Sequence, residues 1–244
     1  MNNKTLQTVD NLFKGIVWLV VGIILNTAIQ LFATAGSQGL ALSFGFPAKG
    51  RLATVLMVGI TIIFMAMTVS IMLWAIRRVS PNVGLHPFQV QKLKWVGYGF
   101  ASIIVGSMVI NAVRVLVTGQ VSEPENQRML EQMAQQGGYG LIFILVLAVI
   151  VAPLVEELIF RGIILNYFFK NGWWWTNVFL SAGLFGLYHV YTGFNLFDFL
   201  QYSLMGLILA IVYKKTRQIQ YAMALHFVNN SFSMLVLVLT MVLH

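Results

Sequence analysis

Seven long apolar stretches follow one another along the chain, separated by short segments that hold most of its charged residues. A helix needs roughly 20 apolar residues to cross the hydrocarbon core of a bilayer. The stretches cover residues 15–35, 52–76, 95–117, 139–169, 173–190, 197–213 and 218–243. This pattern predicts an all-α fold, a polytopic transmembrane helix bundle of about seven spans, or eight if the overlong fourth stretch is a broken helix.

The composition agrees with this class and excludes others. Hydrophobic residues make up 59% of the chain and charged residues 9%, which is too apolar for a soluble domain. The net charge of +8 does not indicate nucleic-acid binding, because the basic residues lie in short clusters between apolar stretches, where they meet anionic lipid headgroups. The absence of cysteine excludes disulfides, thiol catalysis and cysteine-ligated zinc.

Lysine and arginine are distributed unevenly between the two sides of the predicted bundle. With the N-terminus inside, the cytoplasmic segments hold Lys4, Lys14, Arg77, Arg78, Lys92, Lys94, Lys170, Lys214, Lys215 and Arg217, and the opposite side holds Lys49, Arg51 and Arg128. This bias predicts a cytoplasmic N-terminus. Arg114 lies near the end of its span and is expected to reach the interface.

The chain shows no internal repeat, no low-complexity tract and no soluble segment of domain size. We therefore expect a single membrane domain over residues 1–244, with three N-terminal spans and their loops in 1–138. Residues 139–244 form the part that carries polar motifs. The short loops and small size favour a multi-pass protein of a bacterial plasma membrane.

The fourth stretch carries two adjacent carboxylates and an arginine, Glu156, Glu157 and Arg161. An ionisable group inside the bilayer costs at least ~2.5 kcal/mol, so it is rarely present without a pairing or functional reason. Glu157 and Arg161 are four residues apart and share one helix face, where each neutralises the other. Pro153 lacks a backbone N–H and loosens the helix one turn before Glu156.

The fifth and seventh stretches carry polar residues at the same four-residue spacing, Phe185 with His189 and His226 with Asn230. Counting about 1.5 Å per residue from the predicted cytoplasmic turns places Glu156 and both histidines in the middle band of the bilayer. Small residues in 181–186 allow the fifth helix to pack closely against a neighbour. We expect these side chains to converge on a pocket inside the membrane.

Such a set suits hydrolysis without a covalent intermediate. Glu156 beside a neutral imidazole of His189 can deprotonate a water molecule as a general base. His226 and Asn230 on another helix can donate hydrogen bonds to a developing oxyanion. A zinc mechanism is a second option that the residues allow, with Glu156, His189 and His226 as ligands, although the compact H-E-x-x-H spacing is absent.

Three motifs occur in order on successive apolar stretches: Glu156-Glu157-x-x-x-Arg161, Phe185-x-x-x-His189 and His226-x-x-x-Asn230. In this order they resemble the CPBP family, which comprises the type II CAAX prenyl endopeptidases and the Abi-type bacteriocin-processing or immunity proteins. The resemblance runs from about Tyr139 to Asn230 and implies an intramembrane endopeptidase with its catalytic core in 139–244.

The resemblance further implies roles for these residues. Glu156 and His189 would activate water, while His226 and Asn230 stabilise the oxyanion, and Glu157, Arg161 and Phe185 support the site. The implied substrates are CAAX-like, peptide or membrane-tethered chains cut near the C-terminus. The family is commonly labelled a metalloprotease, but a metal-free glutamate mechanism is also argued for it.

Two other classes fit the same polar residues. The glutamates and histidines suit a relay in a proton-coupled transporter, although no pair of broken helices in repeated halves supports this reading. A bacteriocin self-immunity protein that acts by binding would need no chemistry at all.

Overall fold

The computed structural model describes residues 3–120, 125–135, 137–169 and 174–243, and every element in them is helical. The elements, with η for π-helical segments, are α1 (Asn3–Leu31), η1 (Phe32–Gly36), α2 (Ser37–Ser43), α3 (Arg51–Arg77), α4 (Val90–Thr118), α5 (Glu125–Ala134), α6 (Gly138–Leu145), η2 (Val146–Val151), α7 (Ala152–Glu157), η3 (Leu158–Ile164), α8 (Leu165–Tyr167), α9 (Trp174–His189), α10 (Leu196–Thr216) and α11 (Ile219–Leu243). The predicted all-α bundle is confirmed.

Six helices within the described residues are long and apolar enough to cross a membrane. They are Thr8–Ser43, Arg51–Arg77, Val90–Thr118, Gly138–Tyr167, Leu196–Thr216 and Ile219–Met241. The chain is therefore a multi-pass integral membrane protein. The remaining predicted span is present as α9, whose 16 residues reach about 24 Å, less than the ~30 Å hydrocarbon core. The predicted start of that span, Trp173, lies outside the described residues.

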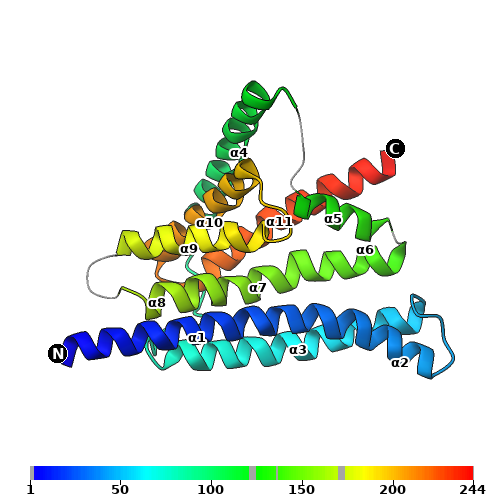
Figure 1. Ribbon diagram of the computed structural model, residues 1–244, viewed down its shortest axis with the longest axis horizontal. Helices are drawn as coiled ribbons and strands as arrows, with labels where there is room; N and C mark the ends of the chain where they lie inside the picture. Colours follow the sequence, from blue (N-terminus) through cyan, green and yellow to red (C-terminus); the bar gives the residue numbers. More distant parts are fainter. Residues whose placement is uncertain (1–2, 121–124, 136, 170–173, 244) are drawn as a thin grey trace.

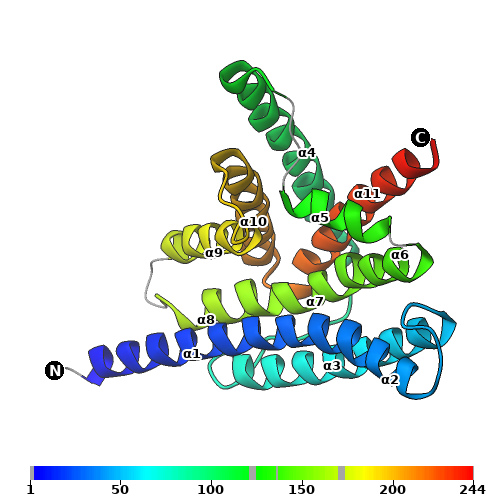
Figure 2. The same cartoon turned by 45° about the vertical axis from the view of Figure 1, so that its right-hand side comes forward.

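The helices form two groups on either side of the broken helix that runs from α6 to α8. Figure 1 shows α1 and α3 as a pair along one side of it, with α9, α10 and α11 on the other side. The turned view in Figure 2 keeps this arrangement and shows α4 steeply inclined to the α1–α3 pair. The broken helix is therefore covered from both sides and lies at the centre of the bundle.

Burial follows from this central position. Each residue of η3 is buried, and Arg161 within it has no exposed surface. Small residues allow the neighbouring helices to approach: a Cβ on Gly22 of α1 would lie 2.8 Å from a side-chain carbon of Ile159. The N-terminal spans thus hold from one side the helix that carries Glu156.

The sequence suggested that Arg114 extends to the membrane interface, and this prediction is wrong. Its side chain is buried and forms an ion pair and hydrogen bond with Asp198, in the first turn of α10. It also donates a hydrogen bond to Asn195, the N-cap of α10, at 3.2 Å. A buried charge is tolerated only with a partner, and here the pair ties α4 to the start of α10.

Candidate active site

The helix that carries Glu156 is broken just before it by a run of π-helical hydrogen bonds. Ala152 at the end of η2 donates its N–H to Leu147, five residues back. The next bond of this pattern would run from Pro153 to Ala148, but proline has no N–H. Asn230 of α11 supplies the missing donor, because its Nδ2 lies 2.8 Å from the Ala148 carbonyl oxygen.

Glu157 is the centre of a buried network that joins α7 and η3 to α10 and α11. Its Oε1 accepts hydrogen bonds from Arg161 Nη1 and from His226 Nδ1, both at 2.9 Å. Arg161 also donates from Nη2 to the carbonyl oxygen of Gly206 in α10 at 2.7 Å. The predicted pair of Glu157 and Arg161 is present, and it fixes the imidazole of His226 as well.

Phe185 and His189 lie on the side of α9 that faces Glu156 and His226; the gap between Glu156, His189 and His226 is called the pocket below. His189 Nδ1 lies 2.8 Å from the carbonyl oxygen of Phe185, an atom that only accepts, so Nδ1 carries a hydrogen. The Phe185 ring packs at 4.3 Å from the ring of His189 and lies 4.7 Å below the Arg161 guanidinium. The ring therefore supports both the histidine and the buried cation.

Close packing of α9 against α10 places His189. A Cβ on Gly186 would overlap the Ser203 hydroxyl and lie 3.0 Å from the Phe199 carbonyl oxygen. Ser181 donates a hydrogen bond to the Phe160 carbonyl oxygen at 2.9 Å on the opposite side. The prediction that small residues bring α9 close is confirmed at Gly186, whereas Gly183 faces open space.

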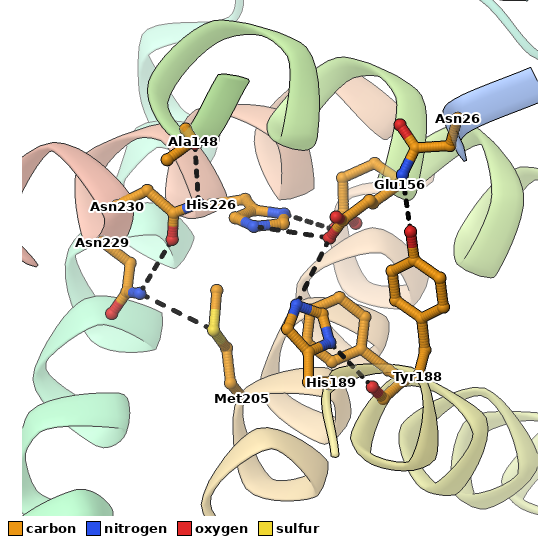
Figure 3. A network of polar contacts seen from close by, with 12 residues as sticks. Asn26, Ala148, Glu156, Tyr188, His189, Met205, His226, Asn229 and Asn230 are labelled. Carbon is orange, nitrogen blue, oxygen red and sulfur yellow. Dashed lines mark hydrogen bonds and ion pairs between the residues drawn. The ribbon is translucent and has the colours of Figure 1, made fainter. Parts of the chain in front are cut away.

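Glu156 faces both histidines across a short gap. Its Oε2 lies 3.7 Å from His189 Nε2 and 4.0 Å from His226 Nε2, and the residue is 6% exposed. Figure 3 shows the three side chains directed toward one point from three different helices. The expected convergence of the fourth, fifth and seventh stretches is therefore present.

Asn230 has a different environment from the one the sequence suggested. One N–H of its amide is directed to Ala148, and its Oδ1 accepts a hydrogen bond from Asn229 at 3.2 Å. Asn229 also contacts the sulfur of Met205 (Figure 3). The side chain of Asn230 therefore bridges α11 and η2 at the edge of the pocket.

Asn26 and Tyr188 are neighbours of the pocket that the sequence did not reveal. Asn26 of α1 is 3% exposed, and its Nδ2 donates to the Tyr188 hydroxyl at 2.7 Å. A buried amide in the middle of the first span was the available signal, since polar groups there need a partner. The partner is 162 positions away and belongs to no shared pattern.

A metal centre is not supported by the side-chain arrangement. Within the described ranges, no group of three or more His, Cys, Asp or Glu side chains is placed to hold a metal ion. Protein ligands of zinc lie about 2.0–2.2 Å from the ion. Two ligands held at that distance by a tetrahedral ion lie roughly 3.3–3.6 Å apart. Glu156 Oε2 lies farther than this from both imidazole Nε2 atoms, at 3.7 and 4.0 Å, so the steps below use only the side chains of the protein.

Comparison with known proteins finds a match in the part of the chain that carries these residues. Residues 138–232 match the family model described as "Type II CAAX prenyl endopeptidase Rce1-like". The matched residues make up less than half of the chain, and we call them the Rce1-like region because of this similarity. The Rce1-like region starts at the first residue of α6 and ends within α11, so it contains Glu156, His189, His226 and Asn230. Helices α1, α3 and α4 lie outside it.

One relative covers more of the chain. A protein of Bacillus subtilis (strain 168) named "Putative membrane peptidase YdiL" is 27% identical over 142 residues. The match covers 57% of this chain and 53% of the relative, so the chain spans about half the length of the relative it matches. No solved structure matches the chain.

Proposed function

We propose that this protein is an intramembrane endopeptidase that uses Glu156 and His189 to activate water. Its substrates are CAAX-like or other membrane-tethered peptides, cut near the C-terminus. The observation that carries the proposal is the approach of Glu156 Oε2 to both imidazole Nε2 atoms at 3.7 and 4.0 Å. The Rce1-like character of residues 138–232 supports it.

The hydrogen-bond partners of the histidines favour a water between these groups. His189 Nδ1 carries a hydrogen toward Phe185, and His226 Nδ1 faces the Glu157 carboxylate. When both imidazoles are neutral, their Nε2 lone pairs face Glu156, and three acceptors then meet without a donor. A water molecule supplies two hydrogens and relieves this conflict.

The reaction then needs only proton transfers between water, Glu156 and the peptide. Glu156 takes a proton from water as the water oxygen bonds to the carbonyl carbon, which gives a tetrahedral oxyanion. The carboxyl group returns the proton to the amide nitrogen as the C–N bond breaks. For this step His226 takes up one proton from solvent at Nε2 before the peptide binds and then donates a hydrogen bond from Nε2 to the oxyanion; the Glu157 carboxylate beside Nδ1 stabilises this imidazolium form.

The remaining parts of the chain serve this site. Asn230 adds an amide at the pocket edge, and residues 1–138 supply spans that hold the core in residues 139–244. The lipid bilayer brings the tethered substrate to the pocket laterally. A cytoplasmic N-terminus follows from the distribution of basic residues.

The test is cleavage of a peptide panel by the purified protein in nanodiscs. The panel contains a prenylated CAAX-like peptide, its unprenylated form and an unrelated lipid-tethered peptide. Glu156→Ala and His189→Ala should reduce cleavage by about 10³-fold, since general acid–base groups contribute about 10²–10⁴-fold. Glu125→Ala and His86→Ala, which change the same residue types outside the pocket, should retain it.

Equal cleavage by wild type and both pocket variants would contradict the proposal. Substrate-dependent proton flux without cleavage, abolished by Glu156→Gln, would point to a transporter. Immunity to a bacteriocin that survives alanine at Glu156, His189 and His226 would point to a binding protein. In either case the endopeptidase assignment fails.

A further inference from the structure

Tyr188 of α9 and Asn26 of α1 form a polar contact beside the pocket. The amide nitrogen of Asn26 lies 2.7 Å from the Tyr188 hydroxyl oxygen. Asn26 is buried, and a polar side chain inside a membrane bundle needs a hydrogen-bond partner, which Tyr188 supplies. The contact links the first span to the residue that directly precedes His189.

The direction of this hydrogen bond leaves the hydroxyl with a free hydrogen. An amide N–H only donates, so the Tyr188 oxygen is the acceptor and its own hydrogen is available to another group. Within the part of the chain that the structure describes, no residue accepts that hydrogen. The hydrogen is therefore free to turn toward an acceptor other than Asn26.

The position of the ring determines what the hydroxyl faces. Tyr188 packs at 5.6 Å from Phe160, one helical turn after Glu156, and at 5.4 Å from His189. Figure 3 shows the Tyr188 hydroxyl at the end of its ring that lies toward Glu156, joined to Asn26 by the hydrogen bond. The hydroxyl thus borders the space in which Glu156 and His189 meet.

We propose that the Tyr188 hydroxyl donates a hydrogen bond to the carbonyl oxygen of the scissile peptide as it becomes an oxyanion. Asn26 is a positioning residue, because its N–H occupies the lone pair that faces α1 and so turns the hydroxyl hydrogen toward the pocket. This rests on the proposed endopeptidase function and extends the site to a span outside the Rce1-like region.

The first experiment compares Tyr188→Phe with Tyr191→Phe in the same nanodisc assay. Tyr191 stacks on Tyr188 at 6.4 Å but is 80% exposed, so it is a matched loss of one hydroxyl. Removing one oxyanion donor costs about 10²–10³ in kcat in well-studied hydrolases. We expect Tyr188→Phe to lower kcat by about 10- to 100-fold with KM within about threefold, and Tyr191→Phe to match wild type.

The second experiment tests whether Asn26 acts through Tyr188. Asn26→Leu should lower kcat by about tenfold, and in the Tyr188→Phe background it should have no further effect. Thr27→Val, an exposed neighbour on the same helix whose hydroxyl bonds only its own helix, is the control and should be silent.

The outcomes separate this inference from the function itself. If wild type cleaves the peptides and Tyr188→Phe cleaves as well as Tyr191→Phe, the inference fails and the endopeptidase stands. Additive losses from Asn26→Leu and Tyr188→Phe, or a rise in KM alone, would mean a structural role and also overturn it. A shifted pH profile with an unchanged plateau rate would place the hydroxyl on Glu156 instead. If wild type cleaves nothing, the proposed function has failed first.

Discussion

Glu156 and Glu157 are adjacent but face different neighbours, because successive side chains on a helix point in directions about 100° apart. Glu157 is turned to Arg161 and His226 and is fully buried with both partners bonded through Oε1. Glu156 is turned to the gap, and its Oε2 has no hydrogen-bond partner among the described residues. The sequence predicted the pair of Glu157 with Arg161 from their spacing. It could not reveal the bond to His226, which depends on how α11 packs.

This difference predicts that substitution of the two glutamates has different effects on thermal stability. Glu156→Gln removes a buried carboxylate whose Oε2 accepts no hydrogen bond from the described residues, so the melting temperature should stay within about 2 °C of wild type or rise, while activity is lost. Glu157→Gln leaves the buried Arg161 without its counter-charge, a defect worth about 3–5 kcal/mol. Its melting temperature should fall by about 5 °C or more in a thermal scan in detergent. A larger fall for Glu156→Gln than for Glu157→Gln would contradict these roles.

At the scale of helices, hydropathy predicted where most elements lie but not how they are interrupted. The predicted stretch 52–76 is α3, Arg51–Arg77, and 218–243 is α11, Ile219–Leu243. Pro153 signalled a loosened helix, yet the π-helical segments and the bond from Asn230 to Ala148 require the partner helix to be known. The predicted stretch 173–190 agrees with α9, Trp174–His189, to within one residue at its C-terminal end, and its first residue lies outside the described residues.

Helix α9 offers a matched pair of glycines for testing how its packing positions His189. Gly186→Ala should lower activity at least tenfold, because the added methyl meets the backbone oxygen of Phe199, which cannot turn aside, and α9 must shift. Gly183→Ala adds the same methyl to open space and should match wild type in the peptidase assay. Equal activity of the two variants would show that α9 packing does not set the site.

At the scale of the whole molecule, the spans without motifs are part of the site's support. The sequence divided the chain at residue 138 by where recognisable motifs begin. The structure crosses that division through Asn26 with Tyr188 and through Arg114 with Asp198. Such contacts join positions far apart in sequence, and a single chain gives no spacing rule from which to predict them.

The orientation of the molecule is testable because the chain has no cysteine. Asn82→Cys lies in the loop after α3 and Gln120→Cys in the loop after α4, and both positions are exposed. A cytoplasmic N-terminus places the first inside and the second outside. A membrane-impermeant maleimide should label Gln120→Cys in intact cells and Asn82→Cys only after permeabilisation. The reverse pattern would contradict the orientation.

The central claim is that Glu156 and His189 act on one water as a unit. The most direct measurement is the single-turnover cleavage rate of wild type, Glu156→Gln, His189→Ala and the double variant in nanodiscs. Groups that act together lose nearly all their effect with the first substitution. We predict a loss of about 10³-fold or more for each single variant and no further loss in the double variant. Independent, multiplying losses, or a Glu156→Gln rate within tenfold of wild type, would contradict the account.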